Sequence, residues 1–247
     1  MKALPFAIAT MAGLVLAGTV MAADIPPAAP PPYRAPVAVV PPYSWTGIYI
    51  NAGGGYGLYS AEDKSLSSGA PLGVARDNGG RGYFGTVGGG FDFQISDRIV
   101  IGAFGDFDFS SIKGNASFNA GSLVGEMKQD WAWAAGGRIG WLITPTILSY
   151  FNGGYGQGNF KSVPLVSNLG APTAFALNSQ TYGGYFLGGG IEYNFWFPGL
   201  FMKSEYRLAN YSASTVNIPG TLGPLSEQIR PYVQTYRTEL IYRFNWR

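Results

Sequence analysis

The chain has 247 residues, a formal net charge of +2 and neither histidine nor cysteine. The small net charge excludes strong electrostatic attraction to nucleic acid, and the lack of cysteine excludes a disulfide framework. Charged residues are only 12% of the chain and aromatic residues 15%, which is typical of a sheet protein whose outer surface does not meet water. Without histidine, the ordinary general base at neutral pH is missing, so we expect neither enzyme activity nor a cofactor.

Residues 1–22 predict a secretory signal peptide. Lys2 supplies the positive start, residues 4–16 form an uncharged apolar core, and Ala22 ends a small-x-Ala pattern that signal peptidase cleaves. An uncleaved anchor helix is the alternative, but the apolar run is shorter than a membrane span. We therefore expect export across the inner membrane and a mature chain that begins at Ala23.

Residues 23–43 are dominated by proline. Proline lacks the backbone donor that a sheet needs and favours the polyproline II conformation, so this stretch predicts a semi-rigid linker. A ligand for a partner domain is the alternative. If the mature chain crosses the outer membrane as an even number of strands, both of its ends lie on the same side, and the linker is expected in the periplasm.

From Ser44 onward the apolar residues repeat with a period of two, which indicates β-strands. Each segment is long enough to cross a membrane as a tilted strand. Residues 44–247 therefore predict an all-β, eight-stranded antiparallel up-and-down transmembrane β-barrel. In the fifth segment two phases compete, Ile147/Phe151/Tyr155 against Leu148/Tyr150. The eight segments are 45–59, 82–95, 99–109, 130–142, 147–159, 181–195, 200–210 and 232–244.

The connections alternate in length. Short turns are expected at 96–98, 144–146 and 197–199, where Asp, Pro and Gly interrupt the pattern. Long connections rich in Ser, Asn, Gly and Ala are expected at 60–81, 110–129, 160–180 and 211–231. Outer-membrane barrels have short periplasmic turns and long extracellular loops, and this alternation follows that rule.

Charge decides which face of each strand meets lipid. The apolar faces of the seven phased strands carry no charged residue, and the opposite faces carry six acids and five bases among glycines. Such charges can pair inside a narrow barrel, whereas a soluble barrel of the opposite orientation would have to pack rows of aromatic rings inside. The predicted lumenal charge network is Asp92, Asp106, Asp108, Arg138, Glu192, Lys203, Glu205, Arg207, Arg237, Glu239 and Arg243.

Aromatic residues on the other face predict a girdle at the membrane interfaces. We assign Tyr56, Trp131, Trp141 and Tyr206 to this girdle. Closure is required because unpaired strand edges in hydrocarbon leave amide groups unsatisfied. Eight strands enclose an interior that side chains just fill, so a wide channel is not expected.

Catalytic and metal-binding patterns are weak in this sequence. Asp106 and Asp108 lie two residues apart on one strand face, as an acid–base pair could, but the bases that point the same way favour ion pairing. The glycine clusters at 53–55, 88–90 and 188–190 open no helical pattern, so they do not predict phosphate loops. No metal site is predicted.

Several short motifs resemble the small porin-like barrels of alphaproteobacteria, the outer-membrane immunogenic protein family. They are WTGIYINAGGGYG at 45–57, ITPT at 143–146, GGIEY at 189–193, MKSEYR at 202–207 and LIYRF at 240–244. The resemblance covers about 44–244. It implies an eight-stranded outer-membrane barrel with a role in envelope integrity and, in some members, surface antigenicity.

Barrels of this kind end on an aromatic residue that the barrel-assembly machinery recognises. Here Trp246 follows Tyr242 and Phe244 in the outward phase, so the three are the expected assembly signal. The other expected partners are outer-membrane lipid and lipopolysaccharide. We expect no nucleic-acid partner.

Three functions are compatible with this pattern. The first is a structural barrel that supports the envelope and presents its loops at the surface. The second is a narrow porin that passes water, ions or small solutes. The third is adhesion by the loops, for which the sequence offers no diagnostic residue. Paired charges in the lumen favour the first, because they occupy the space that a solute needs.

Overall fold

The structure is a computed structural model that describes residues 44–67, 70–71, 76–118, 123–217 and 225–244. The predicted signal peptide (1–22), the linker (23–43) and Trp246 lie outside these residues. Every regular element in the described part of the chain is a β-strand. No helix long and apolar enough to cross a membrane occurs in these ranges.

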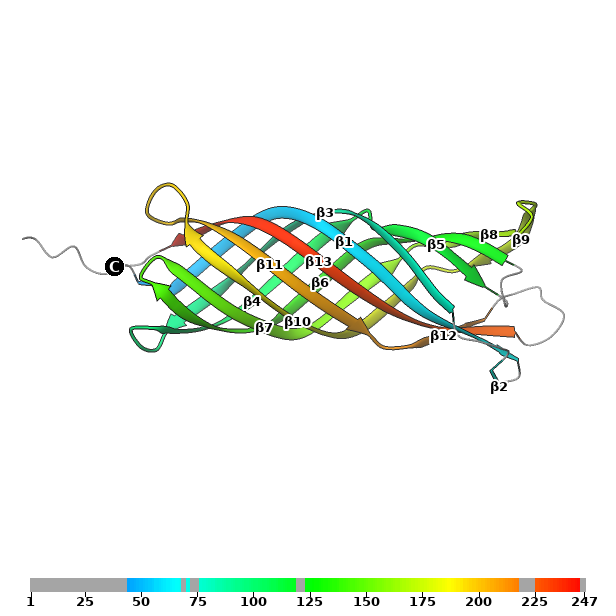
Figure 1. The fold of residues 1–247 in the computed structure, drawn as a ribbon, viewed down its shortest axis with the longest axis horizontal. Helices are drawn as coiled ribbons and strands as arrows, with labels where there is room; N and C mark the ends of the chain where they lie inside the picture. The colour runs from blue at the N-terminus through cyan, green and yellow to red at the C-terminus, as the bar shows by residue number, and fades with distance from the viewer. Residues whose placement is uncertain (1–43, 68–69, 72–75, 119–122, 218–224, 245–247) are drawn as a thin grey trace, which may run out of the picture. The chain divides into compact units, whose positions relative to one another are not determined.

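The described residues include eight long strands, each antiparallel to its neighbours. Strand β13 pairs back onto β1, from Ile48 opposite Phe244 to Ser67 opposite Leu225, so the sheet closes into a barrel (Figure 1). The predicted eight-stranded barrel is therefore confirmed. The long strands are β1 (Gly47–Ser67), β3 (Arg76–Gln94), β4 (Ile99–Ser110), β6 (Leu123–Thr144), β7 (Ile147–Phe160), β10 (Gln180–Asn194), β11 (Leu200–Tyr211) and β13 (Leu225–Phe244).

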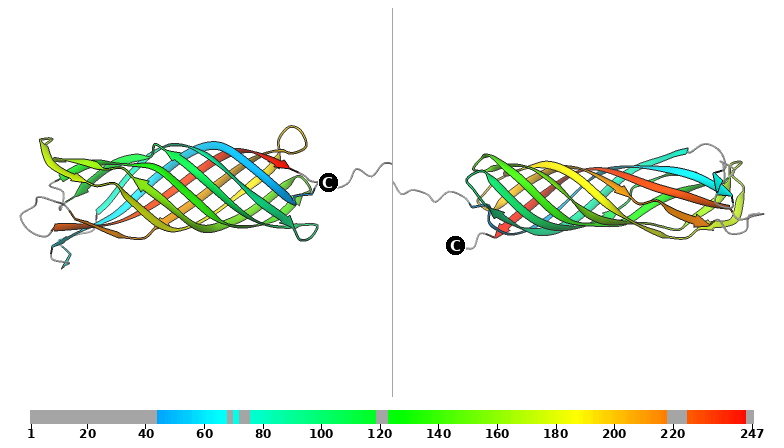
Figure 2. Two further views of the ribbon diagram at one scale, coloured as in Figure 1. Left: turned by 180° about the vertical axis from the view of Figure 1, so that it is seen from behind. Right: turned by 90° about the horizontal axis from the view of Figure 1, so that it is seen from below.

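Much of the sequence expected as long loops is strand. Strands β1 and β3 stay paired as far as Asp63 and Arg76. The same ranges hold the short strands β2 (Ala70–Pro71), β5 (Lys113–Phe118), β8 (Val163–Ser167), β9 (Pro172–Leu177) and β12 (Ser214–Asn217). Figures 1 and 2 show these strands at the end away from the three short turns. Polar residues face outward here, which hides the pattern, while the alternation and the backbone ladder continue.

The apolar rows of the long strands face outward. Ile50, Phe91 and Leu240, for example, are about half exposed. Their chain neighbours Asn51, Asp92 and Glu239 are buried and point into the barrel. In β7, Phe151 and Tyr155 are exposed while Leu148 and Tyr150 are buried, which settles the phase that the sequence left open. On β4 the outward row from Ile99 to Phe109 rises by about 25 Å at ~3.3 Å per residue and a tilt of about 40°. That height matches the apolar band of an outer-membrane barrel.

Two apolar clusters lie inside the barrel. One is at the end with the short turns and is formed by Trp45, Tyr49, Val100, Leu142, Leu148, Tyr150, Phe201 and Ile241. The other, here called the outer apolar core, lies inside the strand extensions at the opposite end. It includes Tyr59, Phe84, Ile112, Phe118, Leu123, Met127, Phe160, Val163, Leu165, Leu177, Tyr182, Tyr211, Val216, Ile229 and Val233.

Candidate functional site

The structure places all eleven residues of the predicted charge network inside the barrel. None has more than 8% of its surface exposed. They come from six strands, and Asn51 of β1 and Asn152 of β7 add polar contacts from the remaining two. Burying so many charges is unfavourable unless each one is paired, so the contacts between them decide what this interior can do.

Four of these residues form a neutral cluster nearest the short turns. Arg138 binds both oxygens of the Asp92 carboxylate, and its Nη1 lies 3.1 Å from an oxygen of Glu192. Arg243 bridges the same two acids, at 2.6 Å to Asp92 and 2.5 Å to Glu192. Two acids and two bases thus neutralise one another across strands β3, β6, β10 and β13.

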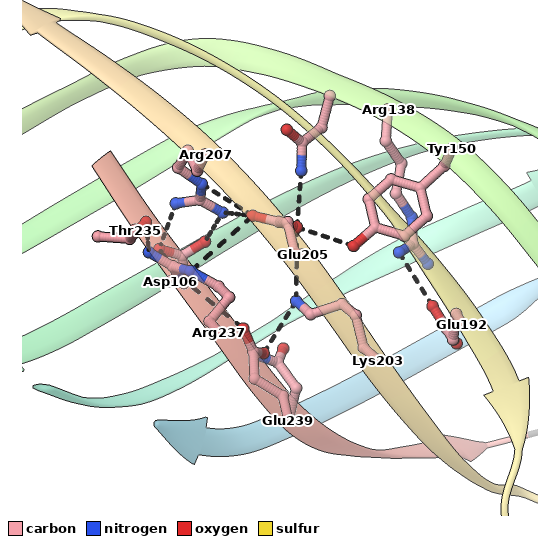
Figure 3. A network of polar contacts seen from close by, with 12 residues as sticks. Asp106, Arg138, Tyr150, Glu192, Lys203, Glu205, Arg207, Thr235, Arg237 and Glu239 are labelled. Atoms are coloured by element: carbon pink, nitrogen blue, oxygen red, sulfur yellow. Dashed lines mark hydrogen bonds and ion pairs between the residues drawn. The ribbon is translucent and has the colours of Figure 1, made fainter. Parts of the chain in front are cut away.

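The remaining seven charges form a second cluster with Glu205 at its centre, and Figure 3 labels all of them except Asp108. Glu205 accepts hydrogen bonds from Arg207, Tyr150 and Asn152 at 2.8–2.9 Å. Because Tyr150 also stacks beneath the Arg138 guanidinium, at 5.2 Å, it connects the two clusters. The charges therefore form one continuous network along the lumen.

Ion pairs across the lumen and between neighbouring strands complete this second cluster. Arg207 makes a two-point contact with Asp106 at 2.9 and 2.8 Å, and Arg237 binds Asp108 at 3.0 Å. Lys203 lies 2.8 Å from Glu239, which is its register partner on β13. Two-point arginine–carboxylate contacts are strong and fix orientation.

Inward-facing aromatic rings fill the space between the charges. The Arg243 guanidinium lies 4.5 Å from the Trp45 ring, Arg138 lies 4.7 Å from Tyr49, and Arg207 lies 4.6 Å from Phe186. Each arrangement fits a cation–π contact. The period-two pattern missed these rings because they interrupt the polar face. An aromatic residue out of phase with its neighbours, such as Tyr49, is the signal that could have found them.

Glycine makes room for these rings. A Cβ atom added at Gly90 would lie 2.5 Å from the Tyr49 hydroxyl, and one added at Gly190 would lie 2.7 Å from the Tyr150 hydroxyl. Both distances are far inside van der Waals contact. The lumenal glycines thus leave the volume that the rings and long side chains occupy.

Buried apolar side chains lie toward both ends of the lumen. At the turn end, Trp45 is fully buried and its indole nitrogen donates to the Pro145 carbonyl at 3.0 Å. At the other end lies the outer apolar core. Between the charges and that core is a cavity of about 30 Å³, whose lining includes Asp108, Gln129 and Tyr211. This volume holds about two water molecules.

Asp106 and Asp108 do not form an isolated acid–base pair. Both contact the Arg237 guanidinium, and Asp106 is also held by Arg207. Carboxylates held in this way are fixed as ion-pair partners. In the described part of the chain, no group of three or more residues has the composition and spacing to hold a metal ion.

The girdle residues lie on the outer wall. Tyr206 and Tyr56 belong to a row of four outward tyrosines in direct register across β11, β13, β1 and β3, with Tyr236 between them and Tyr83 at the end. Three of these are about half exposed or more.

The other two girdle residues and the described part of the expected assembly signal are also outward. Trp141 lies near the short turns, with the Arg98 guanidinium 6.0 Å from its ring. Trp131 stacks on Phe107 at 6.0 Å toward the far end. Tyr242 and Phe244 pack edge to face at 4.9 Å on β13.

These features define a class: a closed antiparallel barrel with an apolar outer wall and a polar, filled interior is an outer-membrane architecture. A family model described as an outer membrane protein beta-barrel domain matches residues 12–244, and the chain belongs to that family. It is thus an outer-membrane protein, with its short turns in the periplasm and its long connections outside the cell.

Two outer-membrane immunogenic proteins are similar to this chain in sequence. The 31 kDa outer-membrane immunogenic protein of Brucella melitensis biotype 1 is 33% identical over 191 residues, covering 71% of this chain and 75% of that protein. The 25 kDa outer-membrane immunogenic protein of the same organism is 27% identical over 214 residues, covering 87% and 86%. The predicted resemblance to this group is confirmed.

One solved structure is similar in fold. The crystal structure of the outer membrane protein OprG from Pseudomonas aeruginosa superposes with a TM-score of 0.54 at 15% identity, covering 81% of this chain and 97% of that one. At this identity the similarity concerns the fold alone.

Proposed function

We propose that this protein is a structural, non-enzymatic barrel that supports the outer membrane without perforating it. The observation that carries the proposal is the continuous charge network, in which buried acids contact buried bases both on adjacent strands and across the lumen. A solute would have to break these pairs. Separating a buried ion pair costs about 3–5 kcal/mol when one charge is left without its partner.

The two ends of the lumen support the same proposal. A solute arriving from the periplasm would meet buried Trp45, which also packs on Phe201 at 5.0 Å. One arriving from outside would meet the outer apolar core. Ions and polar solutes are disfavoured in such an apolar layer.

The proposal of a non-enzymatic role rests on the chemistry of the residues present. The chain has no histidine and no cysteine, and the one candidate acid–base pair, Asp106 and Asp108, is engaged by arginines.

The extracellular part supports a second aspect of this role, which is surface presentation. The relatives are named as immunogenic proteins. Here the strand extensions carry a buried apolar core, so they would present an ordered surface outside the membrane.

Planar-bilayer recording tests the central part of the proposal. We expect the folded protein to give no steady, reproducible conductance steps at neutral pH. Regular steps of one size, proportional in number to the protein added, would contradict the filled lumen and favour the narrow-porin alternative.

A further inference from the structure

Three basic residues lie side by side on the outer wall, on neighbouring strands. Arg81 of β3 is directly opposite Lys113 of β5, and Lys113 is directly opposite Lys128 of β6. Arg81 and Lys113 are exposed and Lys128 is half-buried. The adjacent Ile112, by contrast, is buried, so Lys113 points away from the lumen. Residues directly opposite in an antiparallel pair have Cβ atoms about 5 Å apart.

A fourth base continues the row. The Lys161 amide donates to the Lys128 carbonyl at 2.9 Å, so Lys161 is the next residue around the wall. Arg81, Lys113, Lys128 and Lys161 are called the basic row below. Among the described side chains, the acids in ion-pair contact with the row are Glu126, 3.3 Å from Lys113, and Asp130, 2.9 Å from Lys161. Four bases therefore face two acids.

Such an arrangement is unfavourable by itself, because like charges directly opposite one another in a sheet repel. Another part of the same wall shows the favourable alternative. Across β1 and β13, Glu62 lies directly opposite Arg230 and its carboxylate is 2.9 Å from the Lys64 ammonium. The basic row lacks this alternation, so an anion from outside the chain would relieve its repulsion.

The surface beside the basic row is suited to an apolar chain. A groove of about 440 Å³ is lined on one side by Phe107, Phe109 and Trp131, and on the other by Ser111, Lys128 and Asp130. Phe107 packs edge to face on Phe109 at 5.0 Å and stacks on Trp131 at 6.0 Å, which gives the groove an aromatic floor. The groove thus has an aromatic part and a polar rim, and Lys128 at that rim, beside Asp130, connects it to the basic row.

From this juxtaposition we infer a binding site for a phosphorylated glycolipid of the outer leaflet. Its phosphates would contact Arg81, Lys113 and Lys128, and one acyl chain would lie over the rings of the groove. Arginine and lysine are the usual partners of phosphate. The position at the outer rim of the lipid-facing wall favours a lipid over a soluble anion, because only a lipid also fills an apolar groove.

This inference deepens the proposed structural role by naming its lipid partner, and it rests on that role only for the position of the wall in the membrane. All its residues are on the outer surface, so it does not depend on whether the lumen conducts. A conducting lumen and a failed lipid-binding experiment would therefore be separate findings.

Native mass spectrometry tests the inference by measuring how tightly the folded full chain, in detergent, binds pure lipid A that carries two phosphates. We expect Lys113→Gln/Lys128→Gln to weaken binding at least about tenfold, because two charge-assisted contacts to phosphate are lost. The matched control Lys64→Gln/Arg230→Gln removes the same charge from the alternating part of the wall and should change binding less than twofold. Heat-modifiable migration on a gel verifies that each variant is folded.

Two outcomes would overturn the site. One is binding by Lys113→Gln/Lys128→Gln equal to that of the parent. The other is an equal loss in the control, which would mean that total charge and not this row attracts the lipid. Dephosphorylated lipid A provides an independent arm: we expect the parent to bind it at least about tenfold more weakly than the diphosphorylated form. Equal binding of the two lipids would also contradict the inference.

Discussion

Glu205 shows most clearly how one residue depends on the whole barrel. Its carboxylate accepts hydrogen bonds from Tyr150 and Asn152 of β7 and from Arg207 of its own strand. It also lies directly opposite Arg237 of β13. Buried charges with this many partners contribute little net stability as a pair, but each becomes costly when its partner is removed.

Replacing Glu205 with leucine should therefore destabilise the barrel. The change leaves the Nε–H of Arg207 and the Tyr150 hydroxyl without their acceptor in the buried interior, and we expect a loss of about 3–5 kcal/mol. The urea midpoint of the folded band in heat-modifiable electrophoresis measures this loss.

Asp130→Asn is the matched control for this change. It breaks the exposed ion pair with Lys161, and exposed pairs contribute about 0–1 kcal/mol. If the midpoint of Glu205→Leu matched that of Asp130→Asn, the lumenal contacts would not be contributing as described.

At this scale the sequence indicated which charges point inward but not which of them meet. The period of two separates the faces of a strand, and that is enough to select residues such as Arg138. Its partners Asp92 and Glu192 are on β3 and β10, neither of which adjoins β6. Such contacts depend on strand tilt and stagger around the closed barrel, which a single strand pattern does not contain.

At the scale of elements, the central strands were predictable and their extensions were not. The turns at 96–98 and 144–146 lie where Asp and Pro interrupt the pattern, and the structure has them there. Beyond the membrane the strands lose their apolar outer face, so segments such as β5 and β8 read as loops from composition. Their inward residues, for example Ala116 and Phe118 of β5, still alternate with less buried polar ones.

The extensions depend on the outer apolar core, and Leu165 of β8 is among its most buried residues. We expect Leu165→Ala to loosen the segment from β8 to β9, because a buried Leu→Ala change costs about 2–5 kcal/mol. Hydrogen exchange of 163–177, followed by mass spectrometry, should quicken more than tenfold, while exchange in the membrane part of β7 stays unchanged.

Leu169 gives the control within the same hairpin. It is 92% exposed, so Leu169→Ala removes no buried contact and should leave the exchange of 163–177 as in the parent. Unchanged exchange in Leu165→Ala would mean that the extensions are held by their backbone ladders alone.

At the scale of the whole molecule, closure of the sheet separates a lumenal face from a lipid-facing face. Pairing of β13 with β1 leaves no open edge along the eight-stranded wall, as hydrocarbon requires. The outer wall is then apolar, and the inside is filled in layers, with Trp45 and its neighbours, the charge network and the outer apolar core in succession. The same closure that satisfies the strand edges thus also creates the interior in which these layers pack.

The orientation of the wall is the claim on which the other conclusions depend, and a nitroxide attached at Phe151→Cys tests it most directly. Phe151 is 75% exposed in the lipid-facing part of β7. In liposomes we expect the label to collide more with dissolved oxygen than with a water-soluble nickel chelate, and a label at Leu169→Cys to show the reverse. If the nickel chelate reached the label at Phe151→Cys as readily as the one at Leu169→Cys, the aromatic rows would not face lipid.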